Sequence, residues 1–281
     1  MKVCYHYRVF LFFILLGNYS LLNSQSADPF NQWKEESLSS GIVWKHLHTD
    51  QMFNGFQNLN ALFLDPQKIA LKLLFEQNSL RKTSSFGQEY GAIAAVNGGF
   101  FNVERGGSVT FLKVGGVEIV SMKDQSTGNQ EIRSAAFYIH KGIPGITHAR
   151  DSLWHFHLHE TSDVLVTGPL LLYHNERYPL ASSPFNNNRH PRTGICITED
   201  EKIILLTADG RNSKAYGLTL GELTEIFESL GCRDAINLDG GGSTTLWLLP
   251  YGVVNKPSDN RLFDHEGERP VANVLAIFTI D

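Results

Sequence analysis

Polar side chains that could do chemistry gather in residues 234–247, directly after an apolar run. If residues 235–239 are extended, Asn237 and Asp239 share one face of the strand, because side chains alternate along a strand. An amide and a carboxylate would then lie together at the end of a core strand. The glycines and hydroxyls that follow them are Gly240, Gly241, Gly242, Ser243 and Thr244.

Glycines at these positions suit a binding turn. Without a Cβ they accept positive φ and let a ligand approach the main chain, and their N–H groups can form an anion-binding nest. The alternative is a tight glycine-rich turn that Asp239 merely caps, since such turns are common. We favour a functional site because two polar side chains and the turn converge on one place.

A second stretch, residues 91–102, repeats this arrangement, because an apolar strand ends in an amide and is followed by glycines and aromatic rings. We expect it to contribute to the same site, with Phe100 as a platform for a sugar. The alternative for this ring is a place in the core, where paired phenylalanines are common. The candidate positions are Asn97, Gly98, Gly99 and Phe100.

Two arginines lie at the polar ends of neighbouring strands, since Arg192 enters one strand and Arg211 follows the next. A guanidinium can hold a phosphate or a carboxylate through two parallel hydrogen bonds. Asp209 supplies a second carboxylate beside Arg211. The alternative is that both arginines pair with Asp209 and Asp239 for structural reasons. The net charge of −5 argues against a nucleic-acid binder with a broad basic surface.

The elements expected to position these groups are mostly strands separated by turn residues. They cover residues 41–49, 58–64, 69–75, 91–97, 108–114, 117–121, 133–140, 155–160, 163–173, 195–198, 202–206, 235–239, 253–255 and 271–278. A short helix should begin near Thr83 or Ser84. The clearest helix begins after Thr219, where Glu222 completes a capping box, and it stops at Gly231.

Residues 155–160 alternate histidines with apolar residues, so that three imidazoles would share one strand face. A metal site is one interpretation, because imidazole is a common metal ligand. We prefer an exposed polar face, because any half-buried strand shows this alternation. The polar loop before residue 271 has no EF-hand spacing. We therefore expect neither a metal nor a cofactor.

Residues 1–24 have the pattern of a cleaved signal peptide: a positive start, a short apolar run and then small polar residues. No later stretch is long and apolar enough for a transmembrane segment. We therefore expect export to the periplasm or the extracellular space, with the mature chain beginning between Asn23 and Ala27. A polar N-terminal arm, residues 25–40, would then precede one domain, residues 41–281.

Cys196 and Cys232 are the cysteines that remain after the leader. An oxidising compartment would let them pair, but a domain of this size does not need a disulfide, so the sequence leaves both states open. Neither cysteine lies beside a polar turn that would activate a thiolate. We expect neither to be catalytic.

Six short motifs occur in an order and spacing that resemble the phosphodiester glycosidase family. They begin at Ala95, Gly168, Pro191, Ala208, Ala235 and Glu268. The resemblance implies a single α+β domain, rich in strands with few helices, and its motifs add Thr193 and Arg269 to the site. The expected catalytic residues are Asp239, Asp209 and Arg192, and the expected substrate-binding residues are Asn97, Gly98, Gly99, Phe100, Thr193, Arg211, Asn237, Gly240, Gly241, Gly242, Ser243, Thr244 and Arg269.

The resemblance also implies hydrolysis of the glycosidic bond of a sugar-1-phosphodiester, for example an α-N-acetylglucosaminyl phosphodiester. The residues suit this reaction, which needs fixed positive charge for the phosphate and a carboxylate near the anomeric carbon. Asn97 and Asn237 would then hydrogen-bond sugar hydroxyls or position the carboxylate. Two other functions stay open: a non-catalytic module that binds envelope glycans or phosphoglycans, and a metal-dependent phosphodiesterase with Asp209, Asp239 and the histidines as ligands. The sequence leaves the sugar, the aglycone, the stereochemical outcome and the oligomeric state undetermined.

Overall fold

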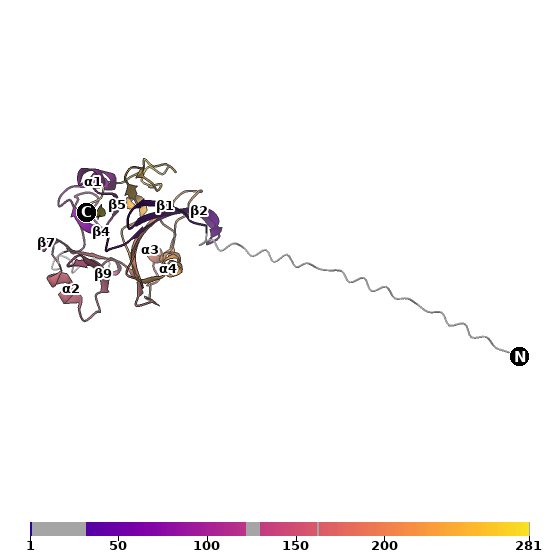
Figure 1. Ribbon diagram of the computed structural model, residues 1–281, viewed down its shortest axis with the longest axis horizontal. Coiled ribbons are helices and arrows are strands. Elements are labelled where there is room, and N and C mark those ends of the chain that lie inside the picture. The colour runs from indigo at the N-terminus through magenta and orange to yellow at the C-terminus, as the bar shows by residue number, and fades with distance from the viewer. Residues whose placement is uncertain (2–31, 122–129, 162, 281) are drawn as a thin grey trace.

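The computed structural model describes residue 1 and residues 32–121, 130–161 and 163–280 (Figure 1). The expected signal peptide, apart from its first residue, and the start of the polar arm lie outside these ranges. None of the helices within them is long and apolar enough to cross a membrane.

Antiparallel strands dominate the described residues and form three sheets. The largest has eight strands in the order β1-β2-β3-β14-β13-β15-β11-β12. Its strands are β1 (Lys34–Ser39), β2 (Ile42–Met52), β3 (Gly55–Leu64), β11 (Leu170–Tyr173), β12 (Glu176–Arg177), β13 (Arg192–Thr198), β14 (Ile203–Ala208) and β15 (Cys232–Asn237).

The expected polar arm, residues 25–40, includes a strand that the sequence did not predict, because residues 34–39 form the edge strand β1 of this sheet. Lys34 of β1 pairs with His46 of β2. The strand is polar and largely exposed, so it has none of the apolar alternation by which strands are recognised. Charged side chains are typical of edge strands, because they discourage pairing with another chain.

The other two sheets have five strands each. One has the order β7-β6-β10-β8-β9 and the other the order β17-β16-β5-β18-β4. The first contains β6 (Leu112–Val114), β7 (Val117–Val120), β8 (Ala135–His140), β9 (Ile143–His148) and β10 (Asp163–Thr167). The second contains β4 (Ile69–Phe75), β5 (Ala94–Asn97), β16 (Leu246–Leu248), β17 (Gly252–Val253) and β18 (Asn273–Thr279).

The helices of the described residues are short. They are α1 (Thr83–Glu89), α2 (Trp154–Glu160), α3 (Pro184–Asn187) and α4 (Leu220–Ser229), with 3-10 turns η3 (Glu131–Arg133) and η4 (Gly241–Ser243). The capping box of α4 is confirmed: Glu222 N–H donates to Thr219 Oγ1 (3.1 Å), and Thr219 N–H donates to the Glu222 carboxylate (2.9 Å). With its few helices and many strands, the chain has the expected α+β class.

The strand expected at residues 155–160 is wrong, because these residues lie in helix α2. The buried side chains of α2 are Trp154 and Leu158, which are four residues apart and therefore on one helix face. The rings of His155 and His159 have the same spacing and lie 6.2 Å apart on an exposed face. Six residues were too few for the alternation to distinguish a strand from a helix.

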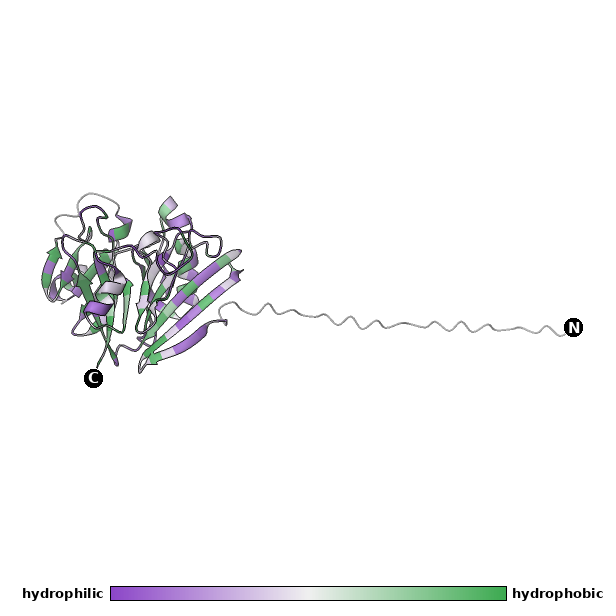
Figure 2. Ribbon diagram, turned by 90° about the horizontal axis from the view of Figure 1, so that it is seen from above, coloured by the Kyte–Doolittle hydropathy of each residue, from purple (hydrophilic) through white to green (hydrophobic). Residues whose placement is uncertain are grey.

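The main hydrophobic core lies between the sheets and takes fully buried side chains from all three, such as Leu62, Phe137 and Leu275. A second cluster packs α4 against the eight-stranded sheet through Phe227 and Ile226. Figure 2 shows the strands with green apolar bands beside purple polar ones, as expected where one face of a strand is buried. Each buried aliphatic side chain contributes about 1.5–3 kcal/mol to folding.

A disulfide joins Cys196 of β13 to Cys232 of the neighbouring strand β15, with Cα atoms 5.8 Å apart. The structure thus settles a pairing that the sequence left open. Both side chains are buried in the cluster beneath α4. The bond ties β15, which leads into the Asp239 turn, to its neighbour in the sheet.

Replacing both cysteines by alanine should lower the free energy of unfolding, because the unfolded chain regains the freedom of a 36-residue loop. A loop of this length corresponds to roughly 3–4 kcal/mol. Urea unfolding with and without reductant measures the effect. The double variant should unfold at the same midpoint in both conditions, whereas an equal midpoint for the reduced and oxidised native sequence would contradict the prediction.

Candidate active site

Three strands of the large sheet bring the candidate residues together. Strand β13 lies between β14 and β15 and runs antiparallel to both, so its first residues lie beside the last residues of its neighbours. Arg192 pairs with Ala208, and Gly194 pairs with Asn237. The segments that follow β14 and β15, with Arg211 and Asp239, therefore leave the sheet next to Arg192.

The Asp239 turn is held by main-chain hydrogen bonds to two other segments. Asp239 N–H donates to Gly98 O (3.0 Å), and Gly241 N–H donates to Pro191 O (2.9 Å). Glycine is required at two positions of the turn. A Cβ on Gly240 would lie 2.6 Å from Pro191 O, and Gly241 has a φ of +63°.

A pocket of about 240 Å³ opens at this turn. Its lining combines a carboxylate, two guanidinium groups, an imidazole, an aromatic ring and exposed main chain. The lining residues are Phe185, His190, Arg192, Arg211, Asp239, Gly240 and Gly241. The structure thus brings together Asp239, both arginines and the start of the glycine run, which are separated by about fifty residues of sequence.

Asp239 is only partly exposed, and the protein atoms around its carboxyl group raise its pKa to about 6. The Ser243 hydroxyl, the Gly240 N–H and the positive charges of Arg269 and Arg211 each lower the pKa and offset part of this effect. Ser243 Oγ faces the carboxyl group without a hydrogen bond of ordinary geometry. Burial therefore has the larger effect, and Asp239 changes charge near neutral pH.

Arg192 is only 2% exposed, and most of its guanidinium is used within the protein. Nε donates to Leu218 O (2.9 Å), and Nη2 donates to the carbonyls of Phe185 (2.5 Å) and Asn188 (3.1 Å). Only Nη1 is left for a ligand, so the free bidentate fork expected from the sequence is wrong. Burial and then the charge of Arg211 lower the Arg192 pKa to about 10, which leaves the group positive at neutral pH.

Arg211 has no hydrogen-bond or ion-pair partner among the described residues. Its backbone has a φ of +62°, and its Nη2 would lie 3.0 Å from a Cβ placed on Gly241. Arg269, in contrast, forms an ion pair with Asp259, and this pair packs against Gly242. Neither pocket arginine pairs with Asp239 or Asp209, so the purely structural pairing considered from the sequence is absent within the described chain.

Asp209 does not line the pocket, so its expected place beside Asp239 in one cleft is wrong. Its carboxylate is 1% exposed and accepts hydrogen bonds from Asn58 Nδ2 (2.6 Å), Asn255 Nδ2 (2.8 Å) and Lys256 N (2.8 Å). Burial raises its pKa, and these three donors oppose the rise. Asp209 therefore joins β3 and β14 to the loop at residues 255–256.

Asn97 is fully buried and fastens the Asp239 turn instead of contacting the pocket. Its Nδ2 donates to Asp239 O (2.7 Å), and its Oδ1 accepts from Thr193 Oγ1 (2.8 Å) and Thr245 N (3.1 Å). Thr193 Oγ1 also contacts Thr244 Oγ1 (3.3 Å). Thr193 and Thr244, which were predicted to bind substrate, are buried supports of the turn, and Asn97 has the positioning role that the sequence left open beside sugar binding.

The remaining predicted positions are divided between support and lining. Asn237 is buried and donates from Nδ2 to Gly168 O (2.8 Å), and Gly99 N–H donates to Asn273 Oδ1 (2.6 Å). Phe100 lies 6.2 Å from Phe185, the ring that lines the pocket. The glycine nest is partly occupied, because Gly241 N–H binds Pro191 and Gly240 N–H faces the Asp239 carboxyl group.

His190 and Phe185 line the pocket, but sequence reasoning assigned neither a role. His190 is partly exposed, and its pKa is lowered by burial and by the charges of Arg192 and Arg211. Its imidazole is therefore neutral at neutral pH. The position of His190 in the polar loop before Arg192 was the available signal. Phe185, whose ring lies 5.1 Å from the Arg192 guanidinium, carried none.

The chain resembles known proteins in sequence. A profile of the phosphodiester glycosidase family matches residues 90–278. Over 91 residues, 32% of this chain, it is 40% identical to the SPbeta prophage-derived uncharacterized protein YomE of Bacillus subtilis strain 168. Over 78 residues, 28% of this chain, it is 37% identical to mouse N-acetylglucosamine-1-phosphodiester alpha-N-acetylglucosaminidase. These alignments span 13% and 15% of the two relatives.

The fold is also that of a solved structure, the catalytic domain of zebrafish N-acetylglucosamine-1-phosphodiester alpha-N-acetylglucosaminidase. The TM-score is 0.63 at 18% sequence identity, over 91% of this chain and 85% of the zebrafish chain. At this identity the likeness concerns the fold alone. Because the family profile spans more than half of the 281 residues and includes the Asp239 turn, the protein belongs to the phosphodiester glycosidase family.

Proposed function

We propose that this protein is an exported hydrolase that cleaves the glycosidic C–O bond of a sugar-1-phosphodiester. One observation carries the proposal: a carboxyl group with a pKa of about 6 shares a 240 Å³ pocket with the uncommitted guanidinium of Arg211. A glycosyl phosphodiester presents an anion next to its anomeric carbon, and this pocket offers a cation next to a carboxylate.

The guanidinium groups would bind the phosphate. Arg211 is the main candidate, because its donors are free of partners in the described chain, and Nη1 of Arg192 adds a further donor. The phosphate leaves as a stable anion when the C–O bond breaks, so fixed positive charge could replace the strong acid of an ordinary glycosidase. Arg192 would also supply positive charge without moving, because backbone carbonyls hold it.

Asp239 would act at the anomeric carbon, either as nucleophile or as the base for water. The pocket lining contains no second carboxylate, since Asp209 is hydrogen-bonded elsewhere. The neutral imidazole of His190 is the remaining group that could accept or donate a proton. Water adds to the sugar, and a phosphate monoester is released.

Hydrolysis in ¹⁸O-labelled water tests this proposal with an α-N-acetylglucosaminyl phosphodiester as substrate. Label in the released sugar supports C–O cleavage. Label in the phosphate would instead favour the phosphodiesterase reaction, which cuts the P–O bond. Binding without turnover over a panel of α-glycosyl phosphodiesters would favour a glycan-binding module.

Export is part of the proposal. The N-terminal pattern and the disulfide between Cys196 and Cys232 support it, because such bonds persist in oxidising compartments. Intact-mass measurement of secreted protein should show a chain that begins between Asn23 and Ala27. Retention of the first twenty residues in a membrane fraction would contradict this expectation.

Asp239→Asn should lower turnover at least about a hundredfold, because the amide keeps the size of the group and removes its charge. It should not lower stability. Because its pKa is raised in the folded state, Asp239 favours folding in its protonated form. This contribution of Asp239 to the free energy of unfolding is full below the unfolded-state pKa and is lost as pH rises through about 6. At pH 7.5 the variant should therefore gain on the order of 2 kcal/mol, and the gain should vanish near pH 4. Urea unfolding at both pH values, beside single-turnover rates, separates the two effects.

The value of kcat/KM should fall about tenfold per pH unit below about pH 6, because an ionised Asp239 is needed as nucleophile or base. His190→Asn is the control, since His190 is the other titratable acid–base group that lines the pocket. The acid limb should persist in that variant and disappear from the residual activity of Asp239→Asn. A rate that rises as pH falls would give Asp239 the role of an acid.

Arg211→Lys and Arg192→Lys should have different effects. Arg211→Lys loses the fork towards the ligand and should raise KM roughly tenfold with an unchanged melting temperature. Arg192→Lys leaves up to three buried carbonyls without a donor and should destabilise the fold by on the order of 2 kcal/mol. Arg177→Lys, on the exposed pair with Glu228, is the matched control. Equal effects of the two pocket substitutions would contradict the assigned roles.

A further inference from the structure

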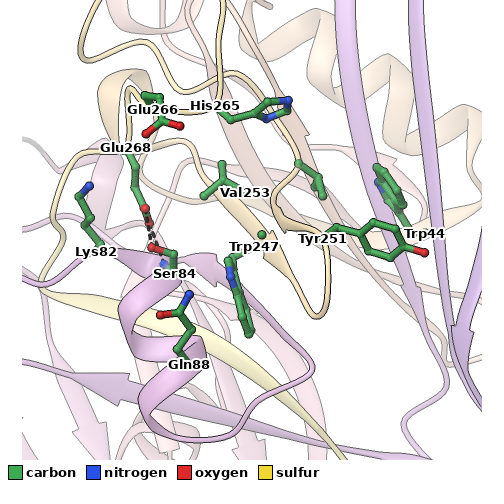
Figure 3. A pocket seen from close by; sticks show the side chains of 12 residues that line it. Trp44, Lys82, Ser84, Gln88, Trp247, Tyr251, Val253, His265, Glu266 and Glu268 are labelled. Carbon is green, nitrogen blue, oxygen red and sulfur yellow. Dashed lines mark hydrogen bonds between the residues drawn. The ribbon is translucent and has the colours of Figure 1, made fainter.

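A second and larger pocket of about 570 Å³ lies apart from the Asp239 site. It is formed by α1, β2, the turn between β16 and β17, and the loop around residue 265 (Figure 3). The two pockets share no lining residue. Consecutive residues face in the two directions: Glu268 lines the larger pocket, and Arg269 lies against Gly242 of the Asp239 turn.

One wall of this pocket consists of aromatic rings that are already fixed. Trp44 Nε1 donates to Asn60 Oδ1 (3.2 Å), and the Tyr251 hydroxyl donates to Glu36 of β1. The two rings lie 5.6 Å apart, and Tyr251 is half exposed. Their orientation would cost little to establish on binding, because the structure holds them before a ligand arrives.

The floor is Trp247, which is 3% exposed. In Figure 3 it lies between Tyr251 on one side and Ser84 and Gln88 of α1 on the other. It packs closely on α1, where a Cβ on Gly87 would lie only 2.3 Å from the indole ring. Two of the four tryptophans of the chain, Trp44 and Trp247, therefore line this one pocket.

The opposite rim is polar and has both donors and acceptors. The side chains of Lys82, Gln88 and Glu266 are exposed and make no hydrogen bond to the described residues. Glu268 is committed to Ser84, whose N–H and Oγ both donate to it. The rim therefore sets the carboxylates of Glu266 and Glu268 against the single ammonium of Lys82 and has no excess of positive charge.

We propose that this pocket binds a neutral oligosaccharide. A sugar ring has apolar C–H faces that pack on aromatic rings and a rim of hydroxyls that both donate and accept hydrogen bonds, and the pocket supplies the complement of both. A phosphate or another anion fits poorly, because Glu266 and Glu268 oppose Lys82. The volume is typical of small-ligand sites and admits more than one sugar ring. The proposal does not depend on hydrolysis at Asp239.

Titration of the full chain with N,N′,N″-triacetylchitotriose, a neutral trisaccharide, tests this proposal. Calorimetry and tryptophan fluorescence should report the same binding, since two tryptophans line the pocket. Tyr251→Ala should weaken binding at least about tenfold, whereas Tyr251→Phe keeps the ring, loses only the hydrogen bond to Glu36 and should weaken binding clearly less than Tyr251→Ala. Gln88→Ala, an exposed change on α1, should weaken binding severalfold without altering the melting temperature.

Asp239→Asn distinguishes this pocket from the catalytic one. The proposal expects chitotriose affinity to be unchanged in that variant, and hydrolysis of a glycosyl phosphodiester to be unchanged in Gln88→Ala. The proposal would be overturned if the native sequence bound no trisaccharide at a concentration on the order of 10 mM. Affinity that falls in Asp239→Asn and is retained in Tyr251→Ala would also overturn it, because the sugar would then occupy the catalytic pocket.

Discussion

The site depends on one buried amide. Asn97, at the end of β5 in one five-stranded sheet, hydrogen-bonds to the Asp239 turn, to Thr193 of the eight-stranded sheet and to the main chain of Thr245. A buried amide that lost these partners would leave its polar atoms unsatisfied, at a cost of their full desolvation free energy. The amide therefore holds the segments in register. This contact between sheets therefore fastens the Asp239 turn against β13, the strand that begins with Arg192.

Around this anchor, the nearby arginines do not form an ion pair with Asp239. Arg192 is bound to carbonyls and Arg269 to Asp259, so neither forms a direct ion pair with Asp239. Burial then raises the Asp239 pKa more than the nearby positive charges lower it. A carboxylate that is poorly solvated and unpaired is reactive toward a developing positive charge at carbon, and an uncommitted guanidinium is available to an anion.

The sequence predicted local features and the main residues of the pocket well, and the roles of individual buried polar side chains less well. The capping box of α4 and the glycine turn rest on nearest neighbours along the chain, and both are present. The roles of Asp209 and Asn97 depend on tertiary partners, because a polar residue at the end of a strand can either face the pocket or support it. Asp209 has three buried donors from distant segments. Strand β1 escaped detection for a related reason, since its pairing with β2 supplies what its polar sequence lacks.

The loop after β17 gives the two pockets a common support. Asn255 donates to Asp209, His265 Nδ1 contacts Asn255 O (2.8 Å), and Glu268 accepts from both donors of Ser84 on α1. The next residue, Arg269, lies against Gly242 of the Asp239 turn. A ligand that contacts Glu266 therefore binds to a segment that is hydrogen-bonded to Asp209 at one end and to Ser84 at the other. Because the two pockets share this loop but no lining residue, they are supported together while each binds with its own side chains.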